Sequence, residues 1–176
     1  LMQVTSADYY TYTHSVNVFV YSASLAKALG HSEDEVHTLG EGALLHDIGK
    51  SKIDTSIINC PGKLTDEQWA EMKMHTIYGY DILKSQGVTD DIILSVTRSH
   101  HEKLHGGGYP DGLKADAINP WVRMVTIADI FDALSTKRSY KEAQDTFHTL
   151  QFMYEHMSEE IDKDFFKTFV HLMGNK

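Results

Sequence analysis

The sequence predicts an all-α fold organised as a single domain, residues 1–176. Apolar residues recur at spacings of three and four in successive segments, and residues typical of helix caps and helix ends separate these segments. We find no convincing strand pattern, no internal repeat, no domain linker and no low-complexity segment. A chain of 176 residues is long enough to bury one substantial core.

The composition argues against several classes of protein. A formal net charge of −9 disfavours a binder of long nucleic acids, which needs a basic face. The single cysteine, Cys60, excludes a disulfide framework and a cysteine-based zinc site. No apolar run is long enough to span a bilayer, and no signal peptide is visible. We therefore expect a cytoplasmic domain without membrane contact, cut from a longer protein because it begins Leu1-Met2.

Two helices are predicted in the first quarter of the chain. The first covers residues 8–29 and ends at Gly30, and a capping box of Ser32 and Glu35 begins the second. Each helix carries a buried stripe that contains a polar residue, and a buried carboxylate is costly unless a partner such as a metal ion compensates it. The stripes are His14, Val18, Tyr21, Leu25 in the first helix and Val36, Leu39, Ala43, Asp47 in the second.

The end of the second predicted helix carries the most informative residues, His46 and Asp47, followed by Gly49 and Lys50. Neighbours in a helix point about 100° apart, so this pair is poorly placed to work as an acid–base couple. It suits two metal ions held side by side, with the carboxylate reaching both. A lone His-Asp pair is usually no more than the end of a helix that carries these two residues without a function. The hypothesis of a metal site therefore depends on ligands from elsewhere in the chain.

The middle of the chain supplies further histidines. A loop through residues 60–62 is followed by a capping box of Thr65 and Gln68, which begins the next predicted helix. That helix carries Trp69 and Met72 and reaches His75, and residues 77–83 are also predicted to be helical. Thr89 is predicted to cap the next helix. Ile93, Val96 and His100 share one of its faces, and His101 follows. Because adjacent helical residues diverge, we expect His100 and His101 to bind different ions.

Residues 102–118 lose all periodicity and contain three consecutive glycines at 106–108. Glycine lets the backbone approach a ligand closely, Tyr109 offers a flat face and Pro110 stiffens the turn. Such a segment can be only a connection, but loops longer than about 12–15 residues in compact domains are more often functional. We expect this loop to border a site.

Three helices are predicted in the last third of the chain. Asn119-Pro120 is a strong helix start, and Val122, Val125, Asp129 and Asp132 share one face of the helix that follows, again with carboxylates in an apolar stripe. Two more amphipathic helices cover residues 142–157 and 160–173. Their inward-facing residues are expected to be Phe147, Leu150, Phe166, Phe169 and Leu172.

Taken together, these motifs resemble the HD-GYP family, bacterial phosphodiesterases of cyclic di-GMP built on the helical HD metal-hydrolase fold. The resemblance covers residues 14–141 and implies an HD helical bundle with an extended Gly-Tyr-Pro loop and two C-terminal helices. In that family the domain usually follows a sensor or receiver domain. The motifs occur in the family's order: His46-Asp47, His75, His100-His101-Glu102, Gly108-Tyr109-Pro110 and Asp129.

The resemblance also implies roles for individual residues. Asp47, His46 and Lys50 would be catalytic, with Asp47 bridging two metal ions. The implied metal ligands are His14, His46, Asp47, His75, His100, His101 and Asp129. The implied substrate-binding residues are Lys50, Arg138, Lys141, Gly108, Tyr109 and Pro110. Imidazoles and carboxylates without a thiolate suit iron or manganese, with zinc or nickel as further possibilities. Two ions about 3.5–4 Å apart can activate water and polarise a phosphoryl oxygen.

Three positions depart from the family pattern. Tyr10 stands one turn before His14, where trinuclear members place a glutamate, so we expect two metal ions rather than three. His105 replaces the aspartate that usually opens the glycine-rich loop, a change expected to loosen the loop or add a ligand near the cleft. Ser139 replaces a common proline after Arg138. Without the third ion, we expect rapid formation of linear pGpG and slow or no formation of GMP.

Three alternatives to a cyclic di-GMP phosphodiesterase stay open from the sequence. One is a phosphodiesterase that prefers the mixed cyclic GMP-AMP. Another is a non-catalytic module that senses the dinucleotide or docks a diguanylate cyclase through the Tyr109 loop, although modules of that kind usually lose the His-Asp pair. The third is a generic HD nucleotide hydrolase, which the Gly108-Tyr109-Pro110 loop disfavours.

Overall fold

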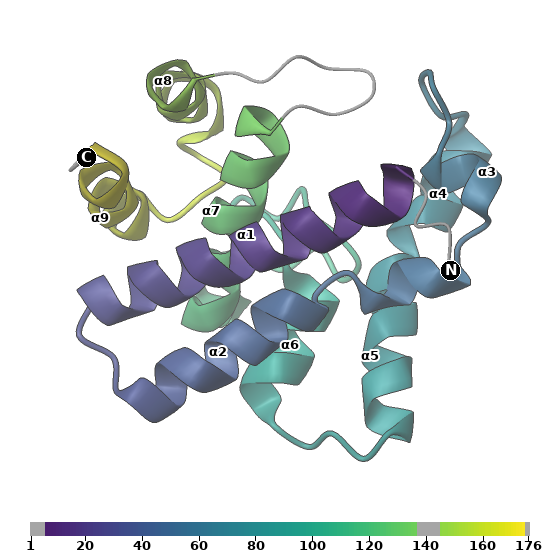
Figure 1. The fold of residues 1–176 in the computed structure, drawn as a ribbon, viewed down its shortest axis with the longest axis horizontal. Helices are drawn as coiled ribbons and strands as arrows, with labels where there is room; N and C mark the ends of the chain where they lie inside the picture. The colour runs from purple at the N-terminus through teal and green to yellow at the C-terminus, as the bar shows by residue number, and fades with distance from the viewer. Residues whose placement is uncertain (1–5, 137–144, 175–176) are drawn as a thin grey trace.

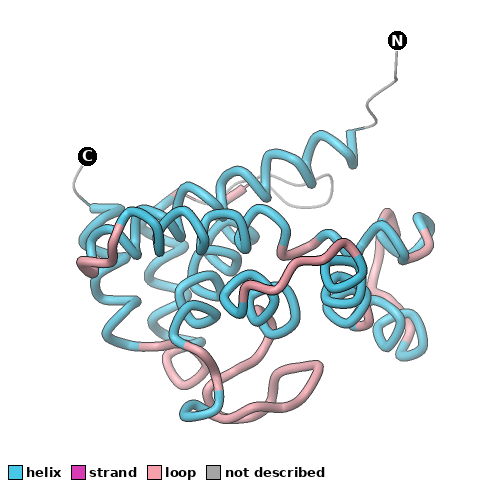
Figure 2. Tube along the Cα trace, turned by 90° about the horizontal axis from the view of Figure 1, so that it is seen from below, coloured by secondary structure: helices cyan, strands magenta, loops and turns pink. Residues whose placement is uncertain are grey.

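The computed structural model describes residues 6–136 and 145–174, with side chains described from residue 12 onward. Within these residues the fold is all-α, as the sequence predicts, and Figure 2 shows helices joined by loops. The only β-type pairing in the described part is one antiparallel bridge between His105 and Lys114. None of the described helices is both long enough and apolar enough to cross a membrane.

Nine α-helices and two 3₁₀ helices make up the described fold (Figure 1). The α-helices are α1 Ser6–Ala28, α2 Glu33–Leu45, α3 Thr55–Ile58, α4 Asp66–Lys73, α5 His75–Ser85, α6 Asp91–Ser99, α7 Pro120–Ser135, α8 Thr146–Met157 and α9 Lys163–Gly174. The 3₁₀ helices are η1 Ile48–Lys52 and η2 Ala115–Ala117.

Local capping explains where several helices begin. The capping boxes at Ser32 and Thr65 are both present, and the Asn119 side chain accepts a hydrogen bond from the backbone amide of Trp121 ahead of α7. At α6 the expectation was wrong by one residue. The cap is Asp90, whose carboxylate accepts from the amides of two following residues, whereas Thr89 precedes it. A carboxylate at this position also complements the helix dipole.

One hydrophobic core joins the long N-terminal helix to α7. The 23-residue α1 crosses the molecule in Figure 1 and packs against α2, α7 and α9, while α6 contacts α2, α5 and α7. The elements that carry the predicted ligands are therefore packed against one another by apolar contacts. Fully buried side chains of this core are Val18, Leu25, Leu39, Val96, Val122, Val125, Ile127 and Phe169.

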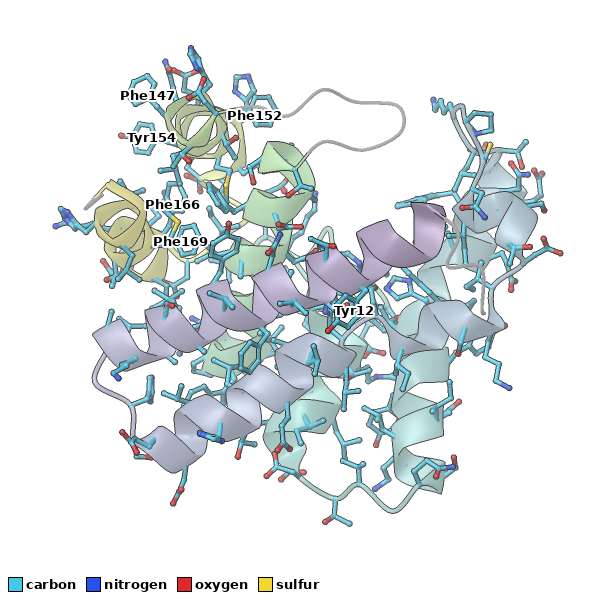
Figure 3. The ribbon with its side chains drawn as sticks, in the orientation of Figure 1. Tyr12, Phe147, Phe152, Tyr154, Phe166 and Phe169 are labelled. Carbon is cyan, nitrogen blue, oxygen red and sulfur yellow. The ribbon has the colours of Figure 1, made fainter. Side chains whose placement is uncertain are left out.

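The two C-terminal helices pack as predicted except at one residue. Phe166 and Phe169 are buried, and the ring of Phe169 contacts Phe131 at 5.1 Å between centroids. Phe147 was expected to face inward but is 70% exposed (Figure 3). The buried residues of α8 are Thr149 and Met153, and a residue two positions from Thr149 lies roughly 200° around the helix. Phe147 therefore points away from α7.

The turn after α2 requires glycine at position 49. A Cβ atom there would lie 1.8 Å from the carbonyl oxygen of His75 and 2.4 Å from the amide nitrogen of Gly79. The backbone of η1 therefore packs directly on α5. This close approach sets Asp47, at the start of η1, beside His75, at the start of α5.

We expect Gly49→Ala to lower the free energy of unfolding by about 1–3 kcal/mol or more, because backbone atoms cannot yield to the added methyl group. Urea denaturation followed by circular dichroism measures this change. The matched control is Gly62→Ala, where an added Cβ meets no described atom within 4 Å. Equal midpoints for the two variants would contradict the requirement for glycine at position 49.

Candidate metal centre

The structure gathers all seven predicted ligand side chains from five separate segments of the fold. They come from α1, the end of α2, the start of α5, the end of α6 and α7. Within each of two groups, the candidate ligand atoms all lie within 4.8 Å of one another. One group is His14, His46 and Asp129, and the other is Asp47, His75, His100 and His101.

The Asp47 carboxylate lies between the two groups. Its Oδ1 is 3.3 Å from Nε2 of His75 and 3.8 Å from Nε2 of His100. Its Oδ2 is 3.4 Å from Nε2 of His46, 3.9 Å from Nε2 of His14, and in an ion pair with Lys50. One oxygen therefore faces each group, the arrangement that a carboxylate shared by two ions needs.

A second carboxylate, that of Asp129, also spans the two groups. Its Oδ1 is 3.1 Å from Nε2 of His14 and 4.0 Å from Nε2 of His46. Its Oδ2 is 3.9 Å from Nδ1 of His101. Asp47 and Asp129 are both buried, and each lies close to imidazoles of both groups. Burial of two carboxylates in so small a volume is favourable only when positive charge compensates them.

Hydrogen bonds behind the imidazoles direct their free nitrogens into the cluster. Nδ1 of His46, His75 and His100 lies 2.6, 2.7 and 3.1 Å from backbone carbonyl oxygens of Ala43, Met72 and Val96. A carbonyl can only accept, so each Nδ1 donates and each neutral ring keeps an Nε2 lone pair. Nε2 of His75 and Nε2 of His100 are 3.4 Å apart.

Two atoms of the cluster lack hydrogen-bond partners among the described residues. They are Nε2 of His46 and Oδ1 of Asp47, and both are buried. Buried polar atoms are normally satisfied, so orphaned acceptors that face other acceptors mark a place for a cation. An all-nitrogen and oxygen donor set with this orientation fits divalent metal ions.

The glycine-rich loop is fastened beside the cluster by Glu102. Its buried carboxylate accepts hydrogen bonds from the backbone amides of Asp111, Gly112 and Leu113 at 2.7, 3.0 and 2.9 Å. The loop passes so close that a Cβ at Gly108 would lie 2.4 Å from the Cα of Glu102. Glu102 belongs to the His-His-Glu run, but the sequence did not predict this role for it. Its partners are backbone amides, which every residue has, so no residue type marks them in the sequence.

This anchoring sets Tyr109 over the most accessible imidazole of the cluster. The Tyr109 ring stacks on His101 with centroids 4.8 Å apart and planes inclined by 29°. Burial raises the pKa of Tyr109, so its phenol stays protonated. His105 accepts the amide of Gly107 on Nδ1 at 3.0 Å and belongs to neither ligand group, so it ties the loop to itself.

Comparison with known proteins identifies the family of this chain. The sequence matches the HD domain family over residues 5–165. The chain belongs to the HD domain family. A 3'3'-cGAMP-specific phosphodiesterase of Vibrio cholerae serotype O1 is 38% identical over 157 residues, which are 89% of this chain and 34% of that protein. A cyclic di-GMP phosphodiesterase of Pseudomonas aeruginosa is 33% identical over 174 residues, 99% of this chain and 42% of that protein.

This HD domain therefore spans less than half the length of either relative. A solved structure of a HDG"Y"P protein from Bdellovibrio bacteriovorus superposes with a TM-score of 0.78 at 22% identity. The superposition covers 98% of this chain and 55% of that one. At this identity the likeness establishes a shared fold, and it confirms the helical HD architecture predicted from the sequence.

His14 of the HD domain is oriented by a carboxylate to which sequence reasoning assigned no role. Its Nδ1 is 2.7 Å from Oδ2 of Asp132, a residue only 1% exposed. Asp132 also accepts from Asn17 at 2.7 Å and from Thr136 at 2.9 Å. A carboxylate behind a ligating histidine fixes the ring and raises its basicity. The apolar stripe of α7 contained Asp132, but its partner lies 118 residues earlier in the chain.

The sequence predicted that His100 and His101 would diverge toward different ions, but the structure places the two side chains in the same group of candidate ligands. The helix ends at Ser99, and His100 caps it, so His101 follows in a turn. Helical divergence therefore does not apply to the pair, and their ring centroids are only 4.1 Å apart.

Four positions singled out by the sequence lie beyond what the structure describes. Arg138, Ser139 and Lys141 fall among residues 137–144, which are outside the described part of the chain. Tyr10 belongs to α1, but its side chain is outside the described set. Their roles stay predictions. Lys50, by contrast, is described and lies against Asp47.

Burial and neighbouring charges shift the pKa values of several groups in the cluster. Burial alone would raise the pKa of Asp47, but Lys50 and His46 outweigh it and hold that pKa well below the usual value. Burial lowers the pKa of His101 to about 4. At His14, burial opposes protonation, but the hydrogen bonds with Asp129 and Asp132 prevail and raise the pKa to about 9.

We expect Asp132→Ala to weaken metal binding about 10–100-fold, because His14 loses the group that orients it. Isothermal titration with Mn²⁺ measures this loss. The matched control is Asp116→Ala, which removes an exposed carboxylate from η2. Identical affinities of the Asp132 variant and the wild type would show that His14 is oriented by other contacts.

Metal affinity should rise with pH up to about 9 and then level off. A metal-binding imidazole must be neutral, whereas the metal-free His14 holds a proton below a pKa of about 9. Each ion entering the His14 group at pH 7 therefore displaces about one proton. Titration of Mn²⁺ in two buffers of different ionisation enthalpy counts the protons released. Binding without proton release at pH 7 would contradict this assignment.

Proposed function

We propose that this HD domain is a metal-dependent phosphodiesterase that hydrolyses cyclic di-GMP to linear pGpG. The observation that carries the proposal is the Asp47 carboxylate, which presents one oxygen to each of two imidazole groups and leaves Oδ1 unpartnered among the described residues. A pair of divalent ions suits such a donor set. The names of the two relatives, both cyclic dinucleotide phosphodiesterases, supply the substrate class.

In this proposal the seven cluster residues hold two divalent ions, one in each group. When bound, such a pair activates water and polarises a phosphoryl oxygen for in-line displacement. The chain's own task is to fix the donors. Asp132 and the backbone carbonyls hold the imidazoles with their lone pairs inward, and Glu102 keeps the loop and Tyr109 at the edge of the cluster. Iron or manganese is the metal best matched to these ligands, and zinc or nickel is also compatible.

Lys50 adds a cation beside the cluster, and the resemblance assigns Arg138 and Lys141 to the same substrate. Lysine acts as a point charge for a phosphate, while the guanidinium of arginine can bind a phosphate or a guanine edge bidentately. Local cations in a protein of formal charge −9 attract a small dianion without attracting a long nucleic acid. We also propose an upstream sensor or receiver domain and a cytoplasmic location, as that resemblance implies.

A preference for cyclic GMP-AMP is the second candidate. It is favoured by the Vibrio cholerae relative, a 3'3'-cGAMP-specific phosphodiesterase that is 38% identical. The two substrates share the same ring of phosphodiesters and differ in one purine. The metal cluster therefore serves both equally, and the choice between them belongs to residues that contact the bases.

Purified protein loaded with Mn²⁺ should convert cyclic di-GMP to pGpG, with GMP appearing slowly or not at all. Chromatographic time courses with cyclic di-GMP and with cyclic GMP-AMP, alongside metal counting, test both substrates. The double variant His46→Ala, Asp47→Ala is the control, and it should lose metal and activity together while circular dichroism shows its helices intact. Hydrolysis of neither dinucleotide by the metal-loaded wild type would refute the proposal and favour a binding module.

Product order tests the role of position 10 within the same experiment. Tyr10→Glu supplies the carboxylate that the resemblance associates with a third ion, so it should raise metal content and speed the cleavage of pGpG. If the unmodified protein already binds three ions and forms GMP without accumulating pGpG, Tyr10 does not limit the second cleavage.

A further inference from the structure

Trp69 is an exposed tryptophan that lies outside the hydrophobic core of the described residues. It lies in α4, whose eight residues are all described and include none that is buried. The side chain is 47% exposed and belongs to neither hydrophobic core cluster of the described residues. Tryptophan is usually well buried, so an exposed one close to a ligand cluster is a candidate for contact with a ligand.

Aromatic contacts connect this indole to the metal centre. Tyr109 stacks on His101 at 4.8 Å between centroids and lies 6.4 Å from His75. Trp69 also contacts Tyr109, with centroids 6.0 Å apart and planes inclined by 80°. The rings of His101, Tyr109 and Trp69 therefore form a continuous series that leads from the cluster toward solvent.

The geometry of the last contact leaves Trp69 available. In a T-shaped pair the edge of one ring meets the face of the other, so at least one face of the indole is free of Tyr109. An indole face that Tyr109 does not cover, close to the proposed metal centre, matches the layout of a nucleotide, whose base is one ribose away from its phosphate. Lys73 follows Trp69 by one helical turn and adds positive charge on that side of α4.

We infer that Trp69 stacks on a guanine base of the cyclic dinucleotide while the adjoining phosphodiester lies at the metal cluster. This inference rests on the proposed function and adds the subsite that recognises the base. Stacking of a base on an aromatic side chain contributes about 1–3 kcal/mol by alanine substitution. Tyr109 contacts the indole, so the glycine-rich loop positions the stacking residue as well as covering His101.

Steady-state kinetics test the inference in the active enzyme. Trp69→Ala should raise KM for cyclic di-GMP about 5- to 140-fold, the equivalent of 1–3 kcal/mol, with a much smaller change in kcat and with wild-type metal content. Trp69→Phe keeps a flat ring and should recover much of the loss. The matched control is Tyr154→Ala, which removes a 69% exposed aromatic side chain from α8 (Figure 3). An unchanged KM for Trp69→Ala in an active enzyme overturns the inference alone.

A binding measurement separates this inference from the proposed function. In a Trp121→Phe background, Trp69 is the only remaining tryptophan, because the chain has two. Titration with GMP should quench its fluorescence saturably, whereas ribose 5-phosphate, which lacks the base, should not. Quenching by GMP in a protein that hydrolyses neither dinucleotide would remove the proposed function and keep the base subsite. Absence of quenching by GMP, or equal quenching by ribose 5-phosphate, would remove the subsite.

Discussion

The fold is organised around an electrostatic requirement: two buried carboxylates and five imidazoles share one small volume. Asp47 and Asp129 each face ligand atoms of both groups, and Oδ1 of Asp47 has no hydrogen-bond partner among the described residues. Without positive charge such a cluster would oppose folding, since burial disfavours every charged group within it. The hydrophobic contacts among α1, α2, α6 and α7 hold these acceptors together. Part of the stability of the apolar core therefore offsets the cost of holding these acceptors together in a preorganised site.

Preorganisation extends outward by one layer of hydrogen bonds. Backbone carbonyls orient three imidazoles, Asp132 orients a fourth, and Asp132 is itself held by Asn17 and Thr136. The packing of η1 on α5 through Gly49 serves the same end, because it fixes the distance between Asp47 and His75. Ligand geometry thus depends on main-chain positions that move little, which favours a reproducible site over an adaptable one.

The sequence predicted most of the helices and their caps from local patterns, and the resemblance to a known family implied the seven residues of the cluster. Polar residues interrupt apolar stripes at His14, Asp47 and Asp129, and capping boxes mark helix starts. What it did not predict depends on contacts between distant segments or on chain direction after a helix ends. Asp132 meets His14 across 118 positions, Glu102 binds backbone amides, and His100 and His101 converge because α6 stops at Ser99. Phe147 faced outward because α8 buries only its Thr149 and Met153 side.

The adjacency of His101 and Glu102 has a mechanical consequence. One residue contributes to the cluster and the next anchors the backbone of the loop at Asp111, Gly112 and Leu113, so the two structures share a single peptide bond. Any change that displaces the loop backbone held by Glu102 would therefore act on the position of His101 as well. A ligand that orders the loop would hold His101 in place, and a contact that disorders the loop would release it. Such a contact would act on the cluster without touching any of its ligand atoms.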